Sequence, residues 1–464
     1  MKRFICQFLA VVSLLIGWRA GEVAGRPHYG GTLRVEMRET VRSLDPAEKP
    51  ASRMESAAKD KLTALLFEPL VRLDESGRPQ AVLALSWQQN SEGRRWLFRL
   101  RTDVRFHDGS VMTPEVAATA LRSFADTWKI TALRDELLVE SDVPLPDLLY
   151  DLAQPSHSIF LRHSDQTLSG TGPFQLAKWE PGRQAVFAAN EQHWAGRPFL
   201  DAVSIEMGRP LAEQLMDLEL GKADFVEIWP NEMRRVPKGA RLWSSLSNTL
   251  IALAFKRGQP ALGDVRLREA LALSIDRTAI LNWLMQKQGE TATSLLPQRL
   301  SGYAFLFSVQ ADAKKARQLV SGLEKLPPAL LLAYDAFDPL ARSMSDRIAL
   351  NAREVGITLK VSSRPLNADI RLMRLPIRSP LPRTVLADLI SSLRLNGVDL
   401  PNAASVEILY KAEKAALAGY YAIPLFHVPE IYGSSPRLKT WITTGISQLG
   451  DWRLDDMWLD AEKP

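Results

Sequence analysis

Histidine is the side chain best suited to metal binding and to acid–base chemistry near neutral pH. The sequence contains six histidines, which are His28, His107, His157, His163, His193 and His427. No two of them have the i, i+4 spacing that places two ligands on one face of a helix. His157 and His163 are closest to one another, in a loop-like segment where Asp165 is the only nearby carboxylate. We therefore expect no metal site and no cofactor.

The local motifs of common enzyme classes are also missing from the sequence. There is no G-x-S-x-G elbow, no H-E-x-x-H motif and no P-loop, and Gly170 and Gly172 do not extend into a dinucleotide fingerprint. A catalytic group can also assemble in space from distant residues, which leaves that possibility open. Because no spacing favours it, we expect a protein that is not an enzyme.

Twelve tryptophans are the other residues with an evident use, because indole rings line many ligand clefts and also fill many cores. Four of them stand in or beside an apparent strand or turn and are predicted to be core: Trp87, Trp96, Trp179 and Trp194. Trp229, Trp243 and Trp452 fall in segments without clear periodicity. These three are candidates for a cleft, with the core as the alternative.

Length and composition indicate an ordinary globular protein. The chain has 464 residues, of which 46% are hydrophobic and 24% charged. At roughly 150 residues per domain, this length favours about three domains. The formal net charge is only +5, without a run of five like charges, so nucleic-acid binding is not expected.

The first 25 residues have the pattern of a secretory signal peptide. Residues 1–3 carry two positive charges, residues 4–18 are almost wholly apolar, and residues 23–25 are the small residues that a signal peptidase reads. The apolar run is short for a membrane span; an uncleaved anchor or a buried helix is the alternative. The only cysteine, Cys6, lies in this segment without the context of a lipoprotein cleavage site. We expect a periplasmic protein without a lipid anchor and, after cleavage, without cysteine chemistry.

Helices and strands alternate along the rest of the chain, which favours an α/β or α+β class over an all-β one. Residues 53–67 and 342–355 are predicted helices, and Gly356 ends the second of them before a strand at 357–361. Residues 265–284 are helical with a break near Ser274 and a restart capped by Asp276.

Two further segments show the same local signals. Thr113 before Pro114 and Glu115 is a strong helix start. The turn at Pro181 and Gly182 predicts a hairpin between strands at 174–179 and 185–190.

Several segments, taken together and in order, resemble a known family. They are Gly31–Leu33, Ser43–Pro46, Leu66–Leu73, Leu83–Trp87, Trp96–Arg101, Val104–Ser110, Gly170–Phe174, Val265–Leu271 and Ser274–Arg277. The family is solute-binding protein family 5, the periplasmic substrate-binding proteins of ABC transporters for oligopeptides, dipeptides and nickel. The resemblance covers most of residues 31–285 well and residues 286–464 weakly.

The resemblance implies an α/β, two-lobed clamp of the type II periplasmic-binding-protein fold with an inserted small domain. The first lobe would comprise residues 26–64, 166–250 and 431–464, the inserted domain residues 65–165, and a shortened second lobe residues 251–430. Ligand would bind between the lobes, which close by a hinge. The hinge strands are expected near 246–255 and 425–432.

The same resemblance suggests ligand contacts by position. Ser52 and Arg53 would stand on a lip that touches ligand in peptide binders. Trp229 and Asn248 would lie near the hinge, and His427 follows a late strand. The shared motifs themselves are expected to be scaffold.

One stretch departs from the family pattern. Peptide binders carry a tryptophan and an acidic, proline-containing loop in the second lobe, whereas residues 368–383 here contain Arg374 and Arg378 and only one acid, Asp369. We hypothesise that Arg374 or Arg378 receives a carboxylate or another anion, because a guanidinium matches a carboxylate in bidentate geometry. The alternative is that both arginines face solvent.

The resemblance implies a monomeric solute receptor that presents a peptide or small organic solute to an ABC permease in the inner membrane. The alternative function is a degenerate clamp that acts as a sensor or partner-binding module without transport. The shortened second lobe and the missing acidic loop favour this alternative more than they would in a typical member.

Overall fold

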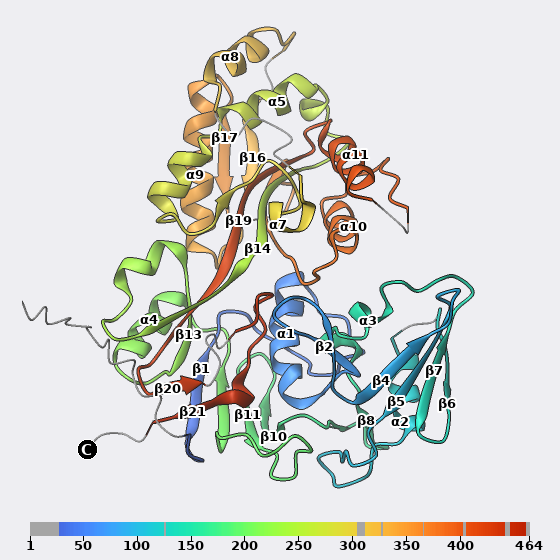
Figure 1. Cartoon of the computed structure of the whole chain (residues 1–464). Helices are drawn as coiled ribbons and strands as arrows, with labels where there is room; N and C mark the ends of the chain where they lie inside the picture. The colour runs from blue at the N-terminus through green and yellow to red at the C-terminus, as the bar shows by residue number, and fades with distance from the viewer. Residues whose placement is uncertain are drawn as a thin grey trace, which may run out of the picture.

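The computed structural model describes residues 27–124, 127–303, 311–325, 328–364, 366–401, 405–440 and 446–460. They fold into two lobes connected by long strands, with a smaller sheet beside the lower lobe in Figure 1. The predicted two-lobed α/β architecture is confirmed. The predicted signal peptide lies outside the described residues. Within the described ranges, no helix has the length and hydropathy that a membrane crossing requires.

The largest sheet in the described part of the chain has 11 strands and passes through both lobes. Its order is β10-β11-β12-β1-β13-β19-β14-β18-β16-β17, and the short β15 (Glu290–Thr291) pairs with β19. The antiparallel strands β14 (Arg241–Phe255) and β19 (Ala422–Ser434) are common to both lobes. The 15 residues of β14 reach roughly 50 Å at about 3.3 Å per residue. The expected hinge ranges 246–255 and 425–432 lie within these two strands.

Lobe I contains the first half of the sheet. β1 (Thr32–Glu36) runs parallel to both β12 (Ala202–Glu206) and β13 (Phe225–Ile228), so the carboxyl ends of these strands meet at one edge. β10 (Phe174–Glu180) and β11 (Gln184–Ala189) form the predicted hairpin. The remaining elements of this lobe are α1 (Arg53–Leu66), α4 (Leu211–Glu219), β20 (Leu438–Thr440) and β21 (Met457–Leu459).

A four-stranded antiparallel sheet, β4-β5-β7-β6, lies beside lobe I. α2 (Pro114–Arg122) packs on it, and the Thr113 hydroxyl caps this helix as predicted, by accepting a hydrogen bond from the Val116 amide. The apolar residues of this sheet and of lobe I form one continuous core. The strands and short elements here are β2 (Val71–Leu73), β3 (Pro79–Ala81), β4 (Ala84–Gln89), β5 (Arg95–Leu100), β6 (Lys129–Ala132), β7 (Glu136–Glu140), α3 (Leu148–Asp151), β8 (Leu161–Arg162) and β9 (Leu168–Ser169).

Two glycines allow the chain to approach the carboxyl end of α1 closely. A Cβ at Gly170 would lie 1.8 Å from the Leu66 carbonyl oxygen, and one at Gly172 would lie 2.6 Å from the Leu65 carbonyl oxygen. The Gly172 amide donates to the Leu66 carbonyl at 2.9 Å. These residues are therefore scaffold, as expected from the sequence.

Lobe II carries helices on both faces of its part of the sheet (Figure 1). One apolar cluster lies under α5, α8 and α9, and a second lies under α10 and α11. The bounds of its elements are α5 (Val265–Ser274), α6 (Arg277–Ala279), α7 (Gln298–Ser301), α8 (Ala313–Ser321), β16 (Leu330–Ala333), α9 (Pro339–Glu354), β17 (Leu359–Ser362), β18 (Ile370–Pro376), α10 (Pro382–Ser392) and α11 (Val406–Leu417).

Two details of lobe II test the local predictions. α5 ends at Ser274, and Asp276 caps the following turn by accepting from the Ala279 amide at 2.9 Å, as predicted. α9 begins at Pro339 rather than at Arg342. The difference arises because Asp338 accepts from the Ala341 amide at 2.8 Å and so caps the helix one turn earlier.

Candidate functional site

A cavity of about 70 Å³ lies between the two lobes, beside the long strands β14 and β19. Lobe I contributes residues 37–39 after β1, side chains of α1 between Met54 and Lys61, and residues 227–230 around the end of β13. Lobe II contributes Arg374 of β18, and the shared strands β14 and β19 contribute Thr249 and residues 429–432. Because both lobes line the cavity, its shape depends on how far they are closed.

Trp229 lies between two guanidinium groups on the wall of this cavity. The Cζ atom of Arg374 is 4.2 Å from the indole ring centroid, and that of Arg38 is 5.3 Å from it. The indole is only 7% exposed. Both distances lie within the range of cation–π attraction, so the ring links a cation of lobe I to a cation of lobe II.

Most of the other charged side chains around the cavity form ion pairs. The Lys61 ammonium is 2.7 Å from the Glu430 carboxylate. Arg38 pairs with Glu39 and, across the lobes, with Asp335 at 3.3 Å. Burial raises the pKa of the Glu39 carboxyl, which the Arg38 guanidinium counteracts. These pairs hold the wall in place rather than leaving it open to a ligand.

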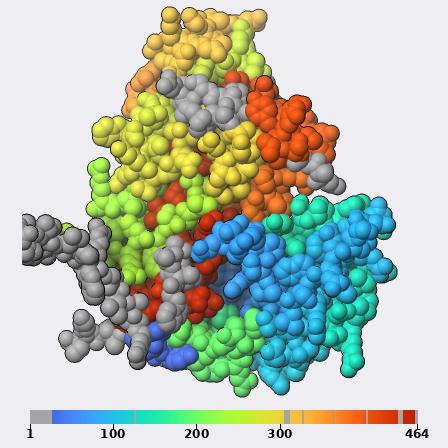
Figure 2. Space-filling view, viewed as in Figure 1, coloured from blue at the N-terminus to red at the C-terminus, as the bar shows by residue number. Residues whose placement is uncertain are grey.

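Ser52 and Arg53, the predicted lip residues, have partners inside the protein. The Ser52 hydroxyl caps α1 by accepting from the Glu55 amide at 3.0 Å. Arg53 makes two hydrogen bonds, of 2.5 and 2.8 Å, to the carboxylate of Asp388 in α10. This pair joins lobe I to lobe II. Figure 2 shows the blue surface of lobe I in contact with the orange surface of lobe II.

Asn248 and Arg378 also lie outside the cavity lining. The Asn248 side chain is fully buried and donates to the Leu449 carbonyl at 2.7 Å. Arg378 donates to Asp451 at 2.7 Å and to the same carbonyl at 3.2 Å, with Asp60 at 3.9 Å. Burial alone would lower the pKa of Arg378, but Asp451 and Asp60 raise it above its usual value. Arg378 therefore neither faces solvent nor offers a free fork to a ligand.

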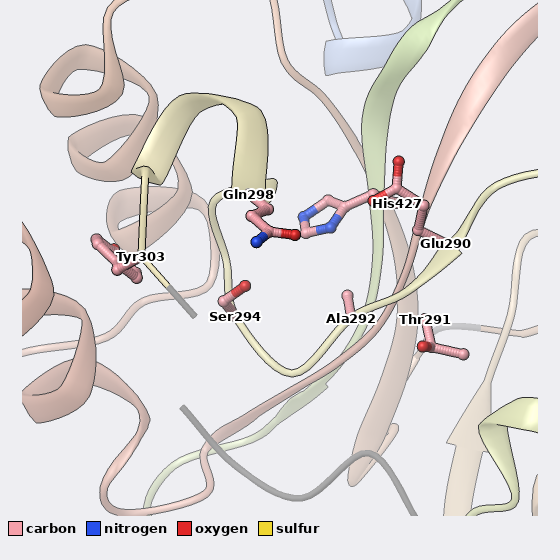
Figure 3. A pocket seen from close by; sticks show the side chains of 7 residues that line it. All are labelled: Glu290, Thr291, Ala292, Ser294, Gln298, Tyr303 and His427. Carbon is pink, nitrogen blue, oxygen red and sulfur yellow. The ribbon is translucent and has the colours of Figure 1, made fainter. Parts of the chain in front are cut away.

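His427 lines a second, much smaller cavity of about 10 Å³ in lobe II (Figure 3). The imidazole is buried, and its Nε2 atom lies 2.9 Å from the Leu295 carbonyl oxygen. Burial lowers the pKa of His427 to about 4, so the ring is neutral at pH 7 and must donate through Nε2. In Figure 3 the Gln298 side chain points toward the ring. This space has room for about one water molecule, not for a solute.

Of the three tryptophans with an open assignment, only Trp229 lies at the cleft. Trp243 is buried and donates from its indole nitrogen to the Ser434 hydroxyl at 2.7 Å. Trp452 packs edge-on against Phe225, with 6.0 Å between ring centroids. Both therefore belong to the core of lobe I.

Sequence reasoning missed most of the cavity wall, including Arg38, Lys61 and Glu430. A positional signal exists for Arg38, which follows a predicted strand closely, because segments after parallel strands often face a ligand crevice. No feature of the neighbouring sequence marks Lys61 as a cavity residue, because its partner Glu430 is far away in the sequence. Within the described ranges, no three histidine, cysteine or acidic side chains are grouped so as to hold a metal ion.

The sequence of this chain is similar to those of known extracellular binding proteins. Residues 78–374 match the family model described as bacterial extracellular solute-binding proteins, family 5 Middle. The chain is 24% identical over 321 residues to the probable D,D-dipeptide-binding periplasmic protein DdpA of Escherichia coli, covering 62% of this chain and 61% of that protein. For the first curated relatives, the match spans 61% to 65% of the relative's own length.

Solved structures show the same fold over nearly the whole chain. NikA from Brucella suis, in complex with Fe(III)-EDTA, has a TM-score of 0.80 at 17% identity, with 93% of this chain and 100% of that chain covered. DppA from Helicobacter pylori, in complex with the peptide STSA, has a TM-score of 0.77 at 16% identity, with 94% and 99% covered. These likenesses confirm the type II periplasmic-binding-protein fold. With a family model that matches well over half of its length, the chain belongs to family 5 of the bacterial extracellular solute-binding proteins, a family of binding proteins rather than enzymes.

Proposed function

We propose that this protein is the solute-binding receptor of an ABC importer and that it holds a peptide or small organic solute in the cavity between its lobes. The observation that supports this proposal is the position of the cavity, which both lobes line beside the strands β14 and β19. A ligand in such a place contacts both lobes only when they close, so binding shifts the population toward the closed form. That closed form would be presented to a membrane permease.

The named relatives fit the same proposal. DdpA is described as a probable D,D-dipeptide-binding protein, and the structure of DppA contains a peptide. The named relatives and solved structures give no support to the sensor or partner-binding alternative without a transported solute. We further propose that the chain acts as a monomer in the periplasm, after removal of residues 1–25.

Native mass spectrometry of the protein purified from the exported fraction, without refolding, tests this function. We expect a co-purifying small molecule that can be ejected and identified by fragmentation, on a chain that begins at Arg26. A clean unliganded mass that stays unchanged after incubation with peptide and organic-anion pools would contradict the receptor function. Such a result would favour the partner-binding alternative.

A further inference from the structure

The space between the lobes limits the size of the solute that this cavity can enclose. The cavity measures about 70 Å³. A cavity needs about 10–15 Å³ to hold one water molecule, so this one has room for about five. In the liquid, five water molecules fill about 150 Å³, which is the space of a molecule of about ten non-hydrogen atoms or fewer.

Contacts between the lobes border the cavity at the end of β13. Trp229 lines the cavity, and two residues later the carbonyl of Asn231 accepts from the Gln286 side chain of lobe II at 2.6 Å. Arg38, which also lines the cavity, lies 3.3 Å from Asp335 of lobe II. A solute that extended out of the cavity on this side would have to displace these contacts.

α1 is tied to lobe II at both ends of the segment that lines the cavity, residues 54–61. Arg53, just before this segment, makes hydrogen bonds of 2.5 and 2.8 Å to Asp388. Asp60, near its end, lies 3.9 Å from Arg378 of lobe II. The lobes are therefore in contact on two sides of the cavity, and its volume is that of a closed clamp.

The wall of the cavity also indicates what kind of compact solute it suits. Charged side chains of both signs line it, three basic and three acidic, so it suits a polar molecule rather than a hydrocarbon. They are Arg38, Lys61, Arg374, Glu39, Glu227 and Glu430.

From this geometry we infer that the solute is a compact polar molecule, smaller than a tripeptide, with about ten non-hydrogen atoms or fewer. This is the size of a single free amino acid or of the smallest dipeptides. The inference rests on the proposed function, because it places the solute in the same cavity. It narrows that function by excluding oligopeptides, which could enter only if the contacts between the lobes were broken.

Ala57 of α1 offers a way to change the volume of this cavity with one substitution. It lines the cavity and is only 4% exposed. Its neighbour Ala58 belongs to the apolar core of lobe I, whereas the apolar clusters of the described chain do not include Ala57. A leucine at position 57 would therefore place three more carbon atoms in the cavity rather than in the core.

Native mass spectrometry of the wild-type protein, purified from the exported fraction without refolding, gives the first measurement. We expect the ejected solute to have about ten non-hydrogen atoms or fewer. A co-purifying tripeptide, or any larger solute, would overturn the inference and leave the receptor function standing. This measurement needs no variant, so it stays decisive if a substitution prevents folding.

The second measurement compares two leucine substitutions on α1. In Ala57→Leu, we expect the fraction of protein that carries the co-purified solute to fall about tenfold or more, because a packed side chain excludes solute atoms. The control is Ala64→Leu, seven residues later on the same face of the helix and half-buried, but not part of the cavity wall. It should carry the solute to the same extent as the wild type.

The outcomes separate the inference from the proposed function. Wild-type occupancy in a folded Ala57→Leu would show that the solute does not fill this cavity, which would overturn the inference but not the receptor function. If the wild-type protein carries no small molecule, and its mass stays unchanged after incubation with peptide and organic-anion pools, the proposed function fails and the inference fails with it.

Discussion

Arg374 and Arg378 lie four residues apart, yet they meet opposite surroundings. Arg378 is enclosed by carboxylates from α1, β19 and the segment near the carboxyl terminus, whereas Arg374 faces an indole and a carboxylate that is partly engaged elsewhere. A buried guanidinium is stable only where acceptors meet its donors. Arg378 therefore connects the lobes, whereas the buried Nε atom of Arg374 has no hydrogen-bond partner among the described residues.

At the residue scale, His427 makes the stability of the folded protein depend on pH. Burial lowers its pKa from 6.5 to about 4, so the folded protein keeps the ring neutral where the unfolded chain already binds a proton. His427 therefore lowers the free energy of unfolding at acidic pH. This loss is absent above pH 6.5 and grows as the pH falls toward 4, by at most about 1.4 kcal/mol per pH unit. We expect His427→Gln to lose less stability than the wild type over this interval, as measured by urea unfolding at each pH.

A control separates this effect from general acid destabilisation. The exposed His28, replaced by Gln, should follow the wild-type stability curve. His157, whose pKa burial also lowers to about 4, remains in all three proteins. Parallel curves for the wild type and His427→Gln would show that His427 does not resist protonation.

At the scale of the elements, neighbouring residues in the sequence determine where a helix begins. Contacts between elements depend instead on segments that are far apart in the sequence. The caps at Thr113 and Asp276 need only their own neighbours in the sequence, and both were predicted. The joint between α1 and the turn at residues 170–172 needs two segments about 100 residues apart, which meet through backbone groups.

This joint predicts a large difference between two glycine substitutions. In Gly170→Ala, the new methyl group meets the Leu66 carbonyl at 1.8 Å. Backbone must therefore shift, and we expect a loss of about 3 kcal/mol or more in the free energy of unfolding. Gly109→Ala has nothing within 4 Å of the new methyl group but a φ of +85°, so its cost should be about 1 kcal/mol. Equal losses for the two variants in urea unfolding would contradict the close approach.

At the scale of the whole molecule, the lobes are held together by contacts of unequal strength. The pair Arg53–Asp388 is well formed, but its side chains are 40% and 46% exposed. Exposed pairs of this kind contribute about 0–1 kcal/mol and weaken with salt. Arg378 is less exposed and faces several carboxylates, which would repel one another without it.

Removing each arginine in turn tests this ranking. We expect Arg378→Gln to open the unliganded clamp, as an increase in the radius of gyration measured by small-angle X-ray scattering, because several half-buried carboxylates lose their shared counter-ion. Arg53→Gln should leave the radius of gyration close to that of the wild type. The reverse order, or an unchanged radius in both variants, would show that other contacts keep the lobes together.

The amino-acid sequence by itself determined the α/β class, the family and several helix and strand positions. The two expected hinge ranges also fall within the long strands β14 and β19. Local signals such as helix caps, prolines and glycines involve only a few neighbouring residues. They can therefore be recognised from the sequence alone, as can the order of the family motifs. The start of α9 was predicted three residues late, because the prediction did not use the cap at Asp338, which accepts from the Ala341 amide.

Only the tertiary structure decided which charged side chains face the cavity. Trp229 and Arg374 were singled out from the sequence, but Arg38, Lys61 and Glu430 were not, and Asn248 and His427 proved to hold backbone carbonyls instead. The reason is that a polar side chain is free or engaged according to partners that stand far away in the sequence. Arg378 meets Asp451 across 73 residues, and Lys61 meets Glu430 across 369. Local spacing contains no record of such partners, whereas the fold brings them within hydrogen-bond distance.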